Sequence, residues 1–194
     1  MDEAGEPTGQ GPAAVLIGPP GAGKSTVGPL VAERLGVTFC DTDDRVEAIA
    51  GKPVGDIFIE DGELAFRALE RDAVAWAVGS SDGAPGGRVI GLGGGAVLDP
   101  DTQRLLAGQP VVYLATGFAS AAKRVGLSAP RPLLAGNPRA ILRKLLEQRL
   151  PVYQKLAWIT VSTDDREPAD IAAEVADKIR SAQSGPDQPS RTAQ

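Results

Sequence analysis

A glycine-rich segment, residues 18–26, constrains the fold of this chain more than any other feature. It reads Gly-Pro-Pro-Gly-Ala-Gly-Lys-Ser-Thr and fits the pattern G-x-x-x-x-G-K-[ST]. An apolar run, residues 13–18, leads into it, and a stretch with helical spacing, residues 24–35, follows. Glycines let backbone N–H groups turn inward around phosphate oxygens, and a helix start adds a favourable dipole. The segment predicts a phosphate-binding turn between a strand and a helix; a plain glycine-rich turn is the alternative.

Apolar runs and helical stretches alternate along the rest of the chain. The runs expected as strands are residues 13–18, 37–40, 88–92, 111–115 and 158–162. Helical spacing is found over residues 24–35, 62–78, 101–107, 118–125, 138–150 and 168–181. Strand–helix alternation indicates a parallel sheet, and strands that are apolar throughout indicate helices on both faces. The predicted fold class is α/β, a three-layer α/β/α sandwich around a five-stranded parallel sheet.

Length and composition narrow the possible functions. The 194 residues fit one domain, expected at residues 13–182, between tails at residues 1–12 and 183–194 that are rich in Gly, Pro, Ser, Gln and charge. Twenty basic against 25 acidic side chains give a net charge of −5, opposite to the basic surface typical of nucleic-acid binding. The absence of histidine excludes His-dependent triads and the commonest zinc ligands.

No stretch of the sequence is apolar for long enough to cross a bilayer, because residues 110–122 are followed by Lys123 and Arg124. The acidic N-terminus lacks the features of a secretory signal. Cys40 is the only cysteine, so no internal disulfide can form. We therefore expect a cytoplasmic protein without a membrane partner, and a monomer, since no large apolar surface stripe demands a second chain.

The glycine-rich motif assigns separate roles to its residues. Lys24 is expected to reach the β and γ phosphates of a nucleoside triphosphate, and Ser25 to bind Mg²⁺. The expected nucleotide-binding residues of the motif are Gly21, Ala22, Gly23, Lys24, Ser25 and Thr26.

Acidic residues follow the second expected strand, at positions 41, 43 and 44. They would lie at the carboxyl edge of the sheet, where ligands collect in folds of this class. One carboxylate could support the metal and another an acceptor hydroxyl. The alternative is helix capping: Asp44 with Glu47 fits a capping box, and a capping role is open for Asp41 or Asp43 as well.

Two arginines in expected helices are candidates for binding an acidic substrate. Arg67 has Glu63 at i−4 and Glu70 at i+3, so a solvated salt-bridge face is its alternative explanation. Arg149 falls just before Pro151, where the dipole of a helix end favours any basic residue.

Two further features complete the candidate pocket. Arg131 lies between two prolines within residues 126–137, which we expect to be a mobile lid, and a merely solubilising role is its alternative. Three glycines, Gly93, Gly94 and Gly95, follow the third strand and allow a ligand close to the main chain, with a flexible loop as the alternative. Aspartate, arginines and bare backbone suit a small polyhydroxylated carboxylate, and they suit a nucleobase poorly.

These segments together resemble the shikimate kinase family, whose members combine a phosphate loop with the fold of nucleoside-monophosphate kinases. The resemblance runs from about residue 13 to residue 180. It is carried, in order, by residues 18–26, Phe39-Cys40-Asp41-Thr42-Asp43, Asp56-Ile57-Phe58, Gly62-Glu63-Leu64-Ala65-Phe66-Arg67, Leu92-Gly93-Gly94-Gly95-Ala96-Val97, Arg131-Pro132-Leu133-Leu134 and Arg149-Leu150-Pro151-Val152-Tyr153. It implies the sheet order 2-3-1-4-5, a substrate-binding helical region at about residues 43–66 and a lid at about residues 126–137.

The resemblance also implies roles for single residues. Shikimate would be held by both arginines on its carboxylate, by Asp43 on its ring hydroxyls and by the glycine turn, that is by Asp43, Arg67, Gly93, Gly94, Gly95 and Arg149. Arg131 would cover the transferring phosphoryl group, and Arg124 and Arg166 would flank adenine. Ser25 would bind Mg²⁺, supported through water by Asp41.

The implied activity is ATP-dependent phosphorylation of the shikimate 3-hydroxyl, giving 3-phosphoshikimate and ADP for aromatic amino-acid biosynthesis. Lys24, Asp43 and Arg131 would be its catalytic residues, with ATP as co-substrate and Mg²⁺ as the metal. A gluconate-type or other small-metabolite kinase, a nucleotide kinase, and a nucleotide-binding module without catalysis are the rival hypotheses. Asp43 together with Arg67 and Arg149 argues against the rival kinases. Intact Lys24, Ser25, Asp43 and Arg131 argue against a module without catalysis.

Overall fold

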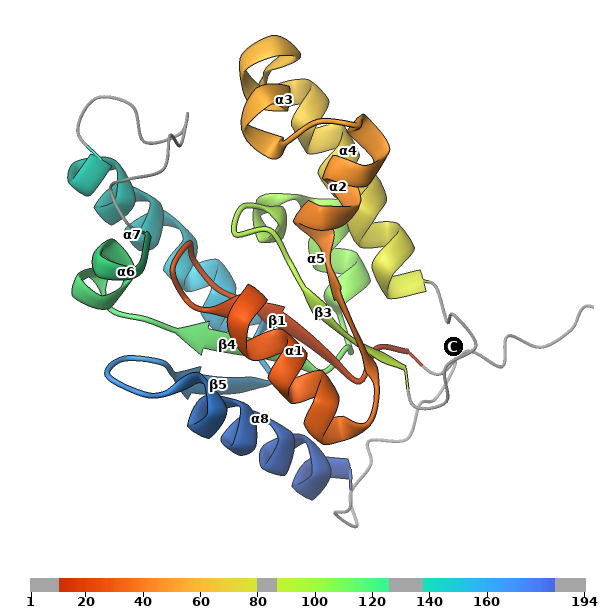
Figure 1. The fold of residues 1–194 in the computed structure, drawn as a ribbon, viewed down its shortest axis with the longest axis vertical. Coiled ribbons are helices and arrows are strands. Elements are labelled where there is room, and N and C mark those ends of the chain that lie inside the picture. The colour runs from red at the N-terminus through yellow and green to blue at the C-terminus, as the bar shows by residue number, and fades with distance from the viewer. Residues whose placement is uncertain (1–10, 80–86, 126–137, 184–194) are drawn as a thin grey trace, which may run out of the picture.

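A five-stranded parallel sheet forms the centre of the computed structural model, which describes residues 11–79, 87–125 and 138–183 (Figure 1). The strands run in the order β2-β3-β1-β4-β5, and every neighbouring pair is parallel. Their bounds are β1 (Ala14–Ile17), β2 (Thr38–Asp41), β3 (Arg88–Gly91), β4 (Val111–Ala115) and β5 (Ile159–Ser162). Both the α/β class and the sheet order are confirmed. The expected lid lies outside the described residues, as do the expected tails except at residues 11, 12 and 183.

Helices connect the strands and cover both faces of the sheet. They are α1 (Lys24–Leu35), α2 (Thr42–Ala50), α3 (Val54–Glu60), α4 (Gly62–Gly79), α5 (Pro100–Leu106), α6 (Phe118–Val125), α7 (Pro138–Leu156) and α8 (Pro168–Gln183), with a short 3₁₀ helix, η1 (Ala96–Leu98). Helices α1 and α8 lie side by side over one face (Figure 1). Within the described ranges, no helix is long and apolar enough to cross a membrane.

The core divides into two layers because alternate residues of β1 point to opposite faces. Ala14 and Leu16 pack against α1 and α8, whereas Val15 and Ile17 pack against α4, α5 and α7. The central strands β1, β3 and β4 are buried along nearly their whole length, as predicted for a sheet covered on both faces. The edge strands differ: β2 and β5 are partly exposed, since each has a neighbouring strand on one side only.

Helices α2, α3 and α4 form a separate small cluster beyond the carboxyl edge of β2 and β3 (Figure 1). Val46, Ile57, Phe66 and Ala73 are buried at its centre, and the rings of Phe58 and Phe66 lie 4.4 Å apart. This cluster covers the helical region implied at about residues 43–66. The apolar spacing alone predicted neither α2 nor α3. Both helices are short, and their buried side chains pack against α4.

The residue that caps α2 is Asp41, so the capping box expected at Asp44 and Glu47 is wrong. Strand β2 continues to Asp41, and the Asp41 Oδ1 accepts a hydrogen bond from the backbone N–H of Asp43 at 3.0 Å. Asp44 consequently lies inside the first turn. The Glu47 carboxylate accepts from the Val54 N–H at 2.9 Å, which joins α2 to α3.

Helix α7 continues six residues past its expected end at residue 150, through Pro151 to Leu156. Proline within a helix removes one backbone hydrogen bond. Burial of Tyr153 and partial burial of Val152 and Leu156 against the sheet offset that loss. Arg149 therefore lies within α7, and its explanation as a residue of the last helical turn is wrong.

The packing of α1 on β2 predicts a steric effect at Gly28. A Cβ there would lie 2.2 Å from Cε2 of Phe39, whose ring is also close to Gly91 of β3, where a Cβ would lie 3.1 Å from its Cζ. We expect Gly28→Ala to lower the free energy of unfolding by about 1–3 kcal/mol, as overpacking does. Urea denaturation checks this. The control is Gly55→Ala in α3, where a Cβ meets nothing within 4 Å and a gain of about 0.5–1 kcal/mol is expected. A Gly28→Ala variant as stable as wild type would contradict the packing.

Candidate active site

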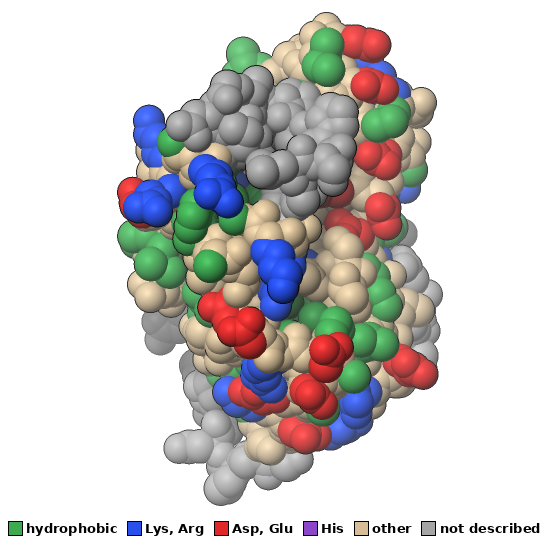
Figure 2. Space-filling model, turned by 60° about the vertical axis from the view of Figure 1, so that its left-hand side comes forward, with side chains coloured by type: hydrophobic (Ala, Val, Ile, Leu, Met, Phe, Trp, Pro, Cys, Tyr) green, Lys and Arg blue, Asp and Glu red, His purple; other side chains and the backbone are tan. Residues whose placement is uncertain are grey.

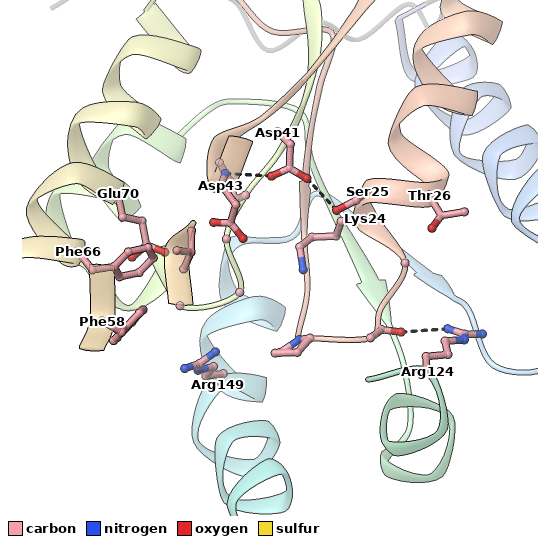
Figure 3. A pocket seen from close by; sticks show the side chains of 18 of the residues that line it. Lys24, Ser25, Thr26, Asp41, Asp43, Phe58, Phe66, Glu70, Arg124 and Arg149 are labelled. Atoms are coloured by element: carbon pink, nitrogen blue, oxygen red, sulfur yellow. Dashed lines mark hydrogen bonds between the residues drawn. The ribbon is translucent and has the colours of Figure 1, made fainter. Parts of the chain in front are cut away.

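A cavity of about 460 Å³ lies at the carboxyl edge of β1, β2 and β3 (Figure 3). The phosphate loop and the start of α1, the end of β2, helices α4 and α7, and the turn after β3 all contribute to it. The predicted site residues that line it are Gly21, Gly23, Lys24, Ser25, Thr26, Asp41, Asp43, Arg67, Gly93, Gly94, Gly95, Arg124 and Arg149. The structure thus brings residues from distant parts of the sequence to one place.

The phosphate loop has the backbone shape that its glycines predict. Gly21 and Gly23 have φ of 81° and 94°, and a Cβ at Gly18 would lie 2.7 Å from the carbonyl oxygen of Leu114. Gly23 begins α1 without a side-chain cap, and no acidic residue stands in the first turn. An uncapped helix start of this kind favours an anion. The ammonium of Lys24 bends over the loop and donates to the carbonyls of Gly18 and Pro19, at 2.7 and 3.2 Å.

Two side-chain oxygens of a kind that can bind a hard cation stand at the start of α1 and at the end of β2. Ser25 Oγ donates to Asp41 Oδ2 at 2.8 Å, and Asp41 is itself fixed by capping α2 (Figure 3). The described residues contain no cluster of three or more His, Cys, Asp or Glu that could hold a metal alone. Mg²⁺ is commonly held by one or two protein oxygens together with substrate phosphates and water. The pair Ser25 and Asp41 fits that requirement.

Two partly or fully buried carboxylates face each other across Gly93. A Cβ at Gly93 would lie 2.7 Å from both Asp43 Oδ1 and Glu70 Oε1, so a side chain there would displace them. Burial, with the negative charges of Asp41 and Glu70, raises the pKa of Asp43 from 3.8 to about 6, against the opposing effect of Lys24. Burial also raises the pKa of Glu70, although Arg67 and Arg149 act to lower it.

Arg67 lies both in a salt-bridge face and at the cavity, the two explanations that the sequence left open. Its guanidinium pairs with Glu70 at 2.6 Å and with Glu63 at 3.2 Å, as an i+3 and i−4 salt-bridge face predicts. It nevertheless lines the cavity, and a Cβ at Gly95 would lie 2.5 Å from its Nη1. The ion pairs therefore hold the guanidinium at the cavity wall, over the glycine turn.

Arg149 reaches the cavity from α7 and is 95% buried, being 5% exposed (Figure 3). Among the described residues its Nε makes no hydrogen bond. A buried donor without an acceptor costs roughly 1–3 kcal/mol. Because Arg149 lines the cavity, a ligand carboxylate there could pair with its guanidinium.

The other predicted nucleotide-binding residues have different environments. Arg124 donates to Gly21 O at 3.3 Å and to both oxygens of Thr163, which joins the phosphate loop to the segment after β5 (Figure 3). Arg166 does not line the cavity: it pairs with Glu174 of α8 at 2.6 Å. Ala22 is a buried residue of the loop itself. Arg131 lies outside the described residues.

Comparison with known proteins identifies the family. Residues 20–180 match the model of the family described as Shikimate kinase. The chain belongs to the shikimate kinase family. It is 57% identical over 171 residues to the shikimate kinase of Thermobifida fusca, which covers 88% of this chain and 96% of that protein. It is 56% identical over 165 residues to that of Salinispora arenicola, covering 85% and 96%.

Solved structures agree with this family assignment. The shikimate kinase of Acinetobacter baumannii, determined in complex with shikimate, matches with a TM-score of 0.82 at 33% identity, over 89% of this chain and 94% of that one. A gluconokinase from Sinorhizobium meliloti matches with a TM-score of 0.50 at 19% identity, over 88% and 93%, which shows a shared fold alone. The family match confirms the predicted enzyme class, an ATP-dependent kinase. It also favours the shikimate kinase family over the gluconate-type alternative.

The sequence reasoning had missed some cavity residues. Glu70 was considered only as a salt-bridge partner of Arg67, and no role was given to Phe58, Phe66, Val54 or Pro20. Glu70 could have been identified from the sequence, because it lies on the buried face of α4 with Phe66, Ala73, Val74 and Ala77. An acid on an apolar face indicates a paired or functional group. Phe58 and Phe66 could not have been identified in this way, because ordinary core packing explains an aromatic side chain at these positions equally well.

The charge of Asp43 is expected to destabilise the ligand-free protein. Because the pKa of the folded state, about 6, lies above the ordinary 3.8, ionisation opposes folding above pH 6. Asp43→Asn should therefore raise the free energy of unfolding at pH 8 by about 1–3 kcal/mol. The gain should shrink as the pH falls from 6 towards 4, where the wild-type carboxyl becomes protonated.

Urea denaturation in EDTA, without nucleotide, measures this effect. Asp44→Asn is the matched control. Asp44 lies on the same helical turn with an exposed side chain, and although partial burial and the charges of Asp41 and Glu47 also raise its pKa, a smaller gain is expected there. An Asp43→Asn variant no more stable than wild type at pH 8 would show that the carboxylate carries no net penalty.

Proposed function

We propose that this chain transfers the γ-phosphoryl group of ATP to the 3-hydroxyl of shikimate, giving 3-phosphoshikimate and ADP. One observation carries the proposal: a single cavity holds the phosphate loop on one side and, on the other, two guanidinium groups with an aspartate and a glycine turn. The first half suits a nucleoside triphosphate, and the second a small acid with several hydroxyls.

Arg67 and Arg149 would bind the carboxylate of shikimate. Arg149 supports this because it lines the cavity from a buried position in α7, and Arg67 because Glu63 and Glu70 hold it at the cavity wall. Asp43 and the main chain of Gly93, Gly94 and Gly95 would bind the ring hydroxyls. Bare backbone there leaves room for a ring that side chains would exclude.

The phosphate loop would hold ATP through its N–H groups and Lys24, with Thr26 and Arg124 at the nucleotide. Ser25, with Asp41 beside it, would bind Mg²⁺, which supplies charge neutralisation at the phosphate oxygens. Arg131 would add a further positive charge at the transferring group, and Arg166 would contact adenine. The roles of these last two arginines rest on the family resemblance.

Asp43 would orient the attacking hydroxyl and accept its proton as the new phosphate ester forms. A carboxyl group with a pKa of about 6 is a stronger base than an ordinary aspartate and is still ionised near neutral pH. Lys24 lies close enough to lower that pKa, which supports a proton acceptor near the proposed γ-phosphate site. Positioning and charge stabilisation would do most of the catalysis.

The remaining expectations stay predictions from composition: one domain over residues 13–182, a monomer, and a cytoplasmic location. Figure 2 shows acidic and basic side chains interspersed over one face of the protein. This distribution, with the net charge of −5, supports the proposal that the partner is a small molecule and that no nucleic acid binds.

A coupled ADP-release assay tests the function. Shikimate, gluconate and nucleoside monophosphates are offered in parallel to the folded protein with ATP and Mg²⁺. We expect turnover with shikimate and only background hydrolysis with the others. Turnover of gluconate or a nucleotide in place of shikimate would overturn the proposal.

Arg67→Ala is expected to raise the KM for shikimate by about 30-fold or more, since a charged hydrogen-bonding pair contributes about 2 kcal/mol. The KM for ATP should change less than about twofold, because the variant leaves the phosphate loop intact. The control is Arg71→Ala, one turn further along α4, where the arginine pairs with Asp99 outside the cavity. Equal effects of both substitutions on the KM for shikimate would contradict the carboxylate role of Arg67.

Asp41→Asn tests the proposed metal site. Asparagine caps helices as well as aspartate does, so α2 should be retained while the charge is lost. We expect the Mg²⁺ concentration for half-maximal activity to rise about tenfold or more, with no such change in Asp44→Asn. A Mg²⁺ titration at saturating substrates measures it, and an unchanged requirement would place the metal elsewhere.

A further inference from the structure

The glycine turn after β3 is tied to the protein by a side chain on each side. The N–H of Gly93 donates to Thr42 Oγ1 at 3.0 Å, and the carbonyl of Gly94 accepts from the Tyr153 hydroxyl at 2.6 Å. Thr42 precedes Asp43 in α2, and Tyr153 follows Arg149 by one helical turn in α7. Both residues that hold the turn are thus neighbours of proposed substrate-binding residues.

Tyr153 is among the most deeply buried polar side chains near the cavity. It is 1% exposed, and its ring stacks on Tyr113 with 5.2 Å between centroids. Burial raises the pKa of its hydroxyl to about 12, so the hydroxyl keeps its proton at physiological pH. It is therefore available as a donor to Gly94 throughout the working range of an enzyme.

The same hydroxyl is also linked to Arg149. The positive charge of the nearby Arg149 guanidinium opposes the effect of burial on the Tyr153 pKa. Residues four apart lie on the same side of a helix, so Arg149 and Tyr153 meet along one face of α7. The hydroxyl can accept from the guanidinium and donate to the Gly94 carbonyl at the same time.

We propose that Tyr153 is a positioning residue for the acceptor, whose hydroxyl holds the Arg149 guanidinium and the Gly94 carbonyl in one fixed arrangement. This inference rests on the proposed function, since it assigns Tyr153 a task in the shikimate pocket. The carboxylate-binding cation and the glycine turn then form a single preformed site, although one is carried by α7 and the other follows β3. Tyr153 itself does not line the cavity and acts through these two groups.

Packing alone does not account for the hydroxyl. The ring of Tyr153 fills the layer beneath the sheet with Val15, Ile17 and Tyr113, a task that phenylalanine would perform as well. A buried hydroxyl costs free energy unless it is bonded, and here its hydrogen bond leads to the glycine turn of the proposed acceptor site.

Tyr153→Phe tests the proposal, with Tyr113→Phe as its matched control. Each substitution removes one hydroxyl from the same stacked pair, but only that of Tyr153 bonds the glycine turn. For Tyr153→Phe we expect the KM and the dissociation constant for shikimate to rise about 5- to 10-fold, with the KM for ATP within twofold of wild type. Tyr113→Phe should change none of these.

A purely structural role predicts a different result. It would lower the unfolding midpoint and leave the KM for shikimate unchanged, or shift both KM values together, and either result would overturn the proposal. Calorimetric titration of shikimate into each folded variant separates loss of affinity from loss of folded protein. If wild type turns over shikimate while Tyr153→Phe and Tyr113→Phe behave alike, the inference fails and the proposed function stands.

A double-variant cycle tests the link to Arg149. If Tyr153 acts through that guanidinium, Tyr153→Phe should raise the shikimate dissociation constant much less in an Arg149→Ala background than in wild type. Independent, multiplying effects of the two substitutions would contradict the coupling.

Discussion

The close approach of two glycine-rich turns is the contact on which this site depends. A Cβ at Gly94 would lie 3.2 Å from Pro20 Cδ and 3.4 Å from Gly18 O, so the turn after β3 packs directly on the phosphate loop. The reason lies in the sheet. Strands β1 and β3 are parallel neighbours, and their following segments leave the same edge side by side. Because Gly94 has no side chain that would hold the two turns apart, the proposed phosphate and acceptor sites open into one cavity, and groups bound there would lie within reach of each other.

The cavity gathers acidic groups on one side and basic groups on the other, and this crowding lowers the stability of the ligand-free protein. Asp41, Asp43 and Glu70 crowd one side, and the raised pKa of Asp43 records the cost of holding its charge there. Lys24, Arg67 and Arg149 supply the opposite sign, yet Arg149 Nε has no acceptor among the described residues. Buried charges that are incompletely paired favour a ligand which completes the pairing. The proposed acceptor, an acid with hydroxyl groups, would do so on both sides, with its carboxylate at the arginines and a hydroxyl at Asp43.

The sequence predicted best those features that local residues determine. Glycine spacing predicted the phosphate loop, and apolar runs predicted the strands. No strand end lies more than one residue from its predicted position. Features that depend on distant packing were missed. Asp41 caps α2 because β2 extends one residue further than its apolar run, and α7 passes Pro151 because Tyr153 is buried against Tyr113 of β4. The ion pair of Arg166 with Glu174 was not predicted either, because Glu174 lies eight residues further along the chain, in α8. For the substrate, Asp43, Arg67 and Arg149 were candidates from their types alone, and the fold brings them into one cavity.

The central claim is that this cavity recognises an acid through its two guanidinium groups, across from the phosphate loop. The most direct test is calorimetric titration of the wild-type protein with shikimate and with its methyl ester, in the presence of Mg²⁺ and a non-hydrolysable ATP analogue. The two ligands share the ring hydroxyls and differ in the charge that Arg67 and Arg149 would bind. The account predicts that shikimate binds at least about 30-fold more tightly, as loss of a charged hydrogen-bonding pair implies. Equal affinity for the acid and the ester would contradict it.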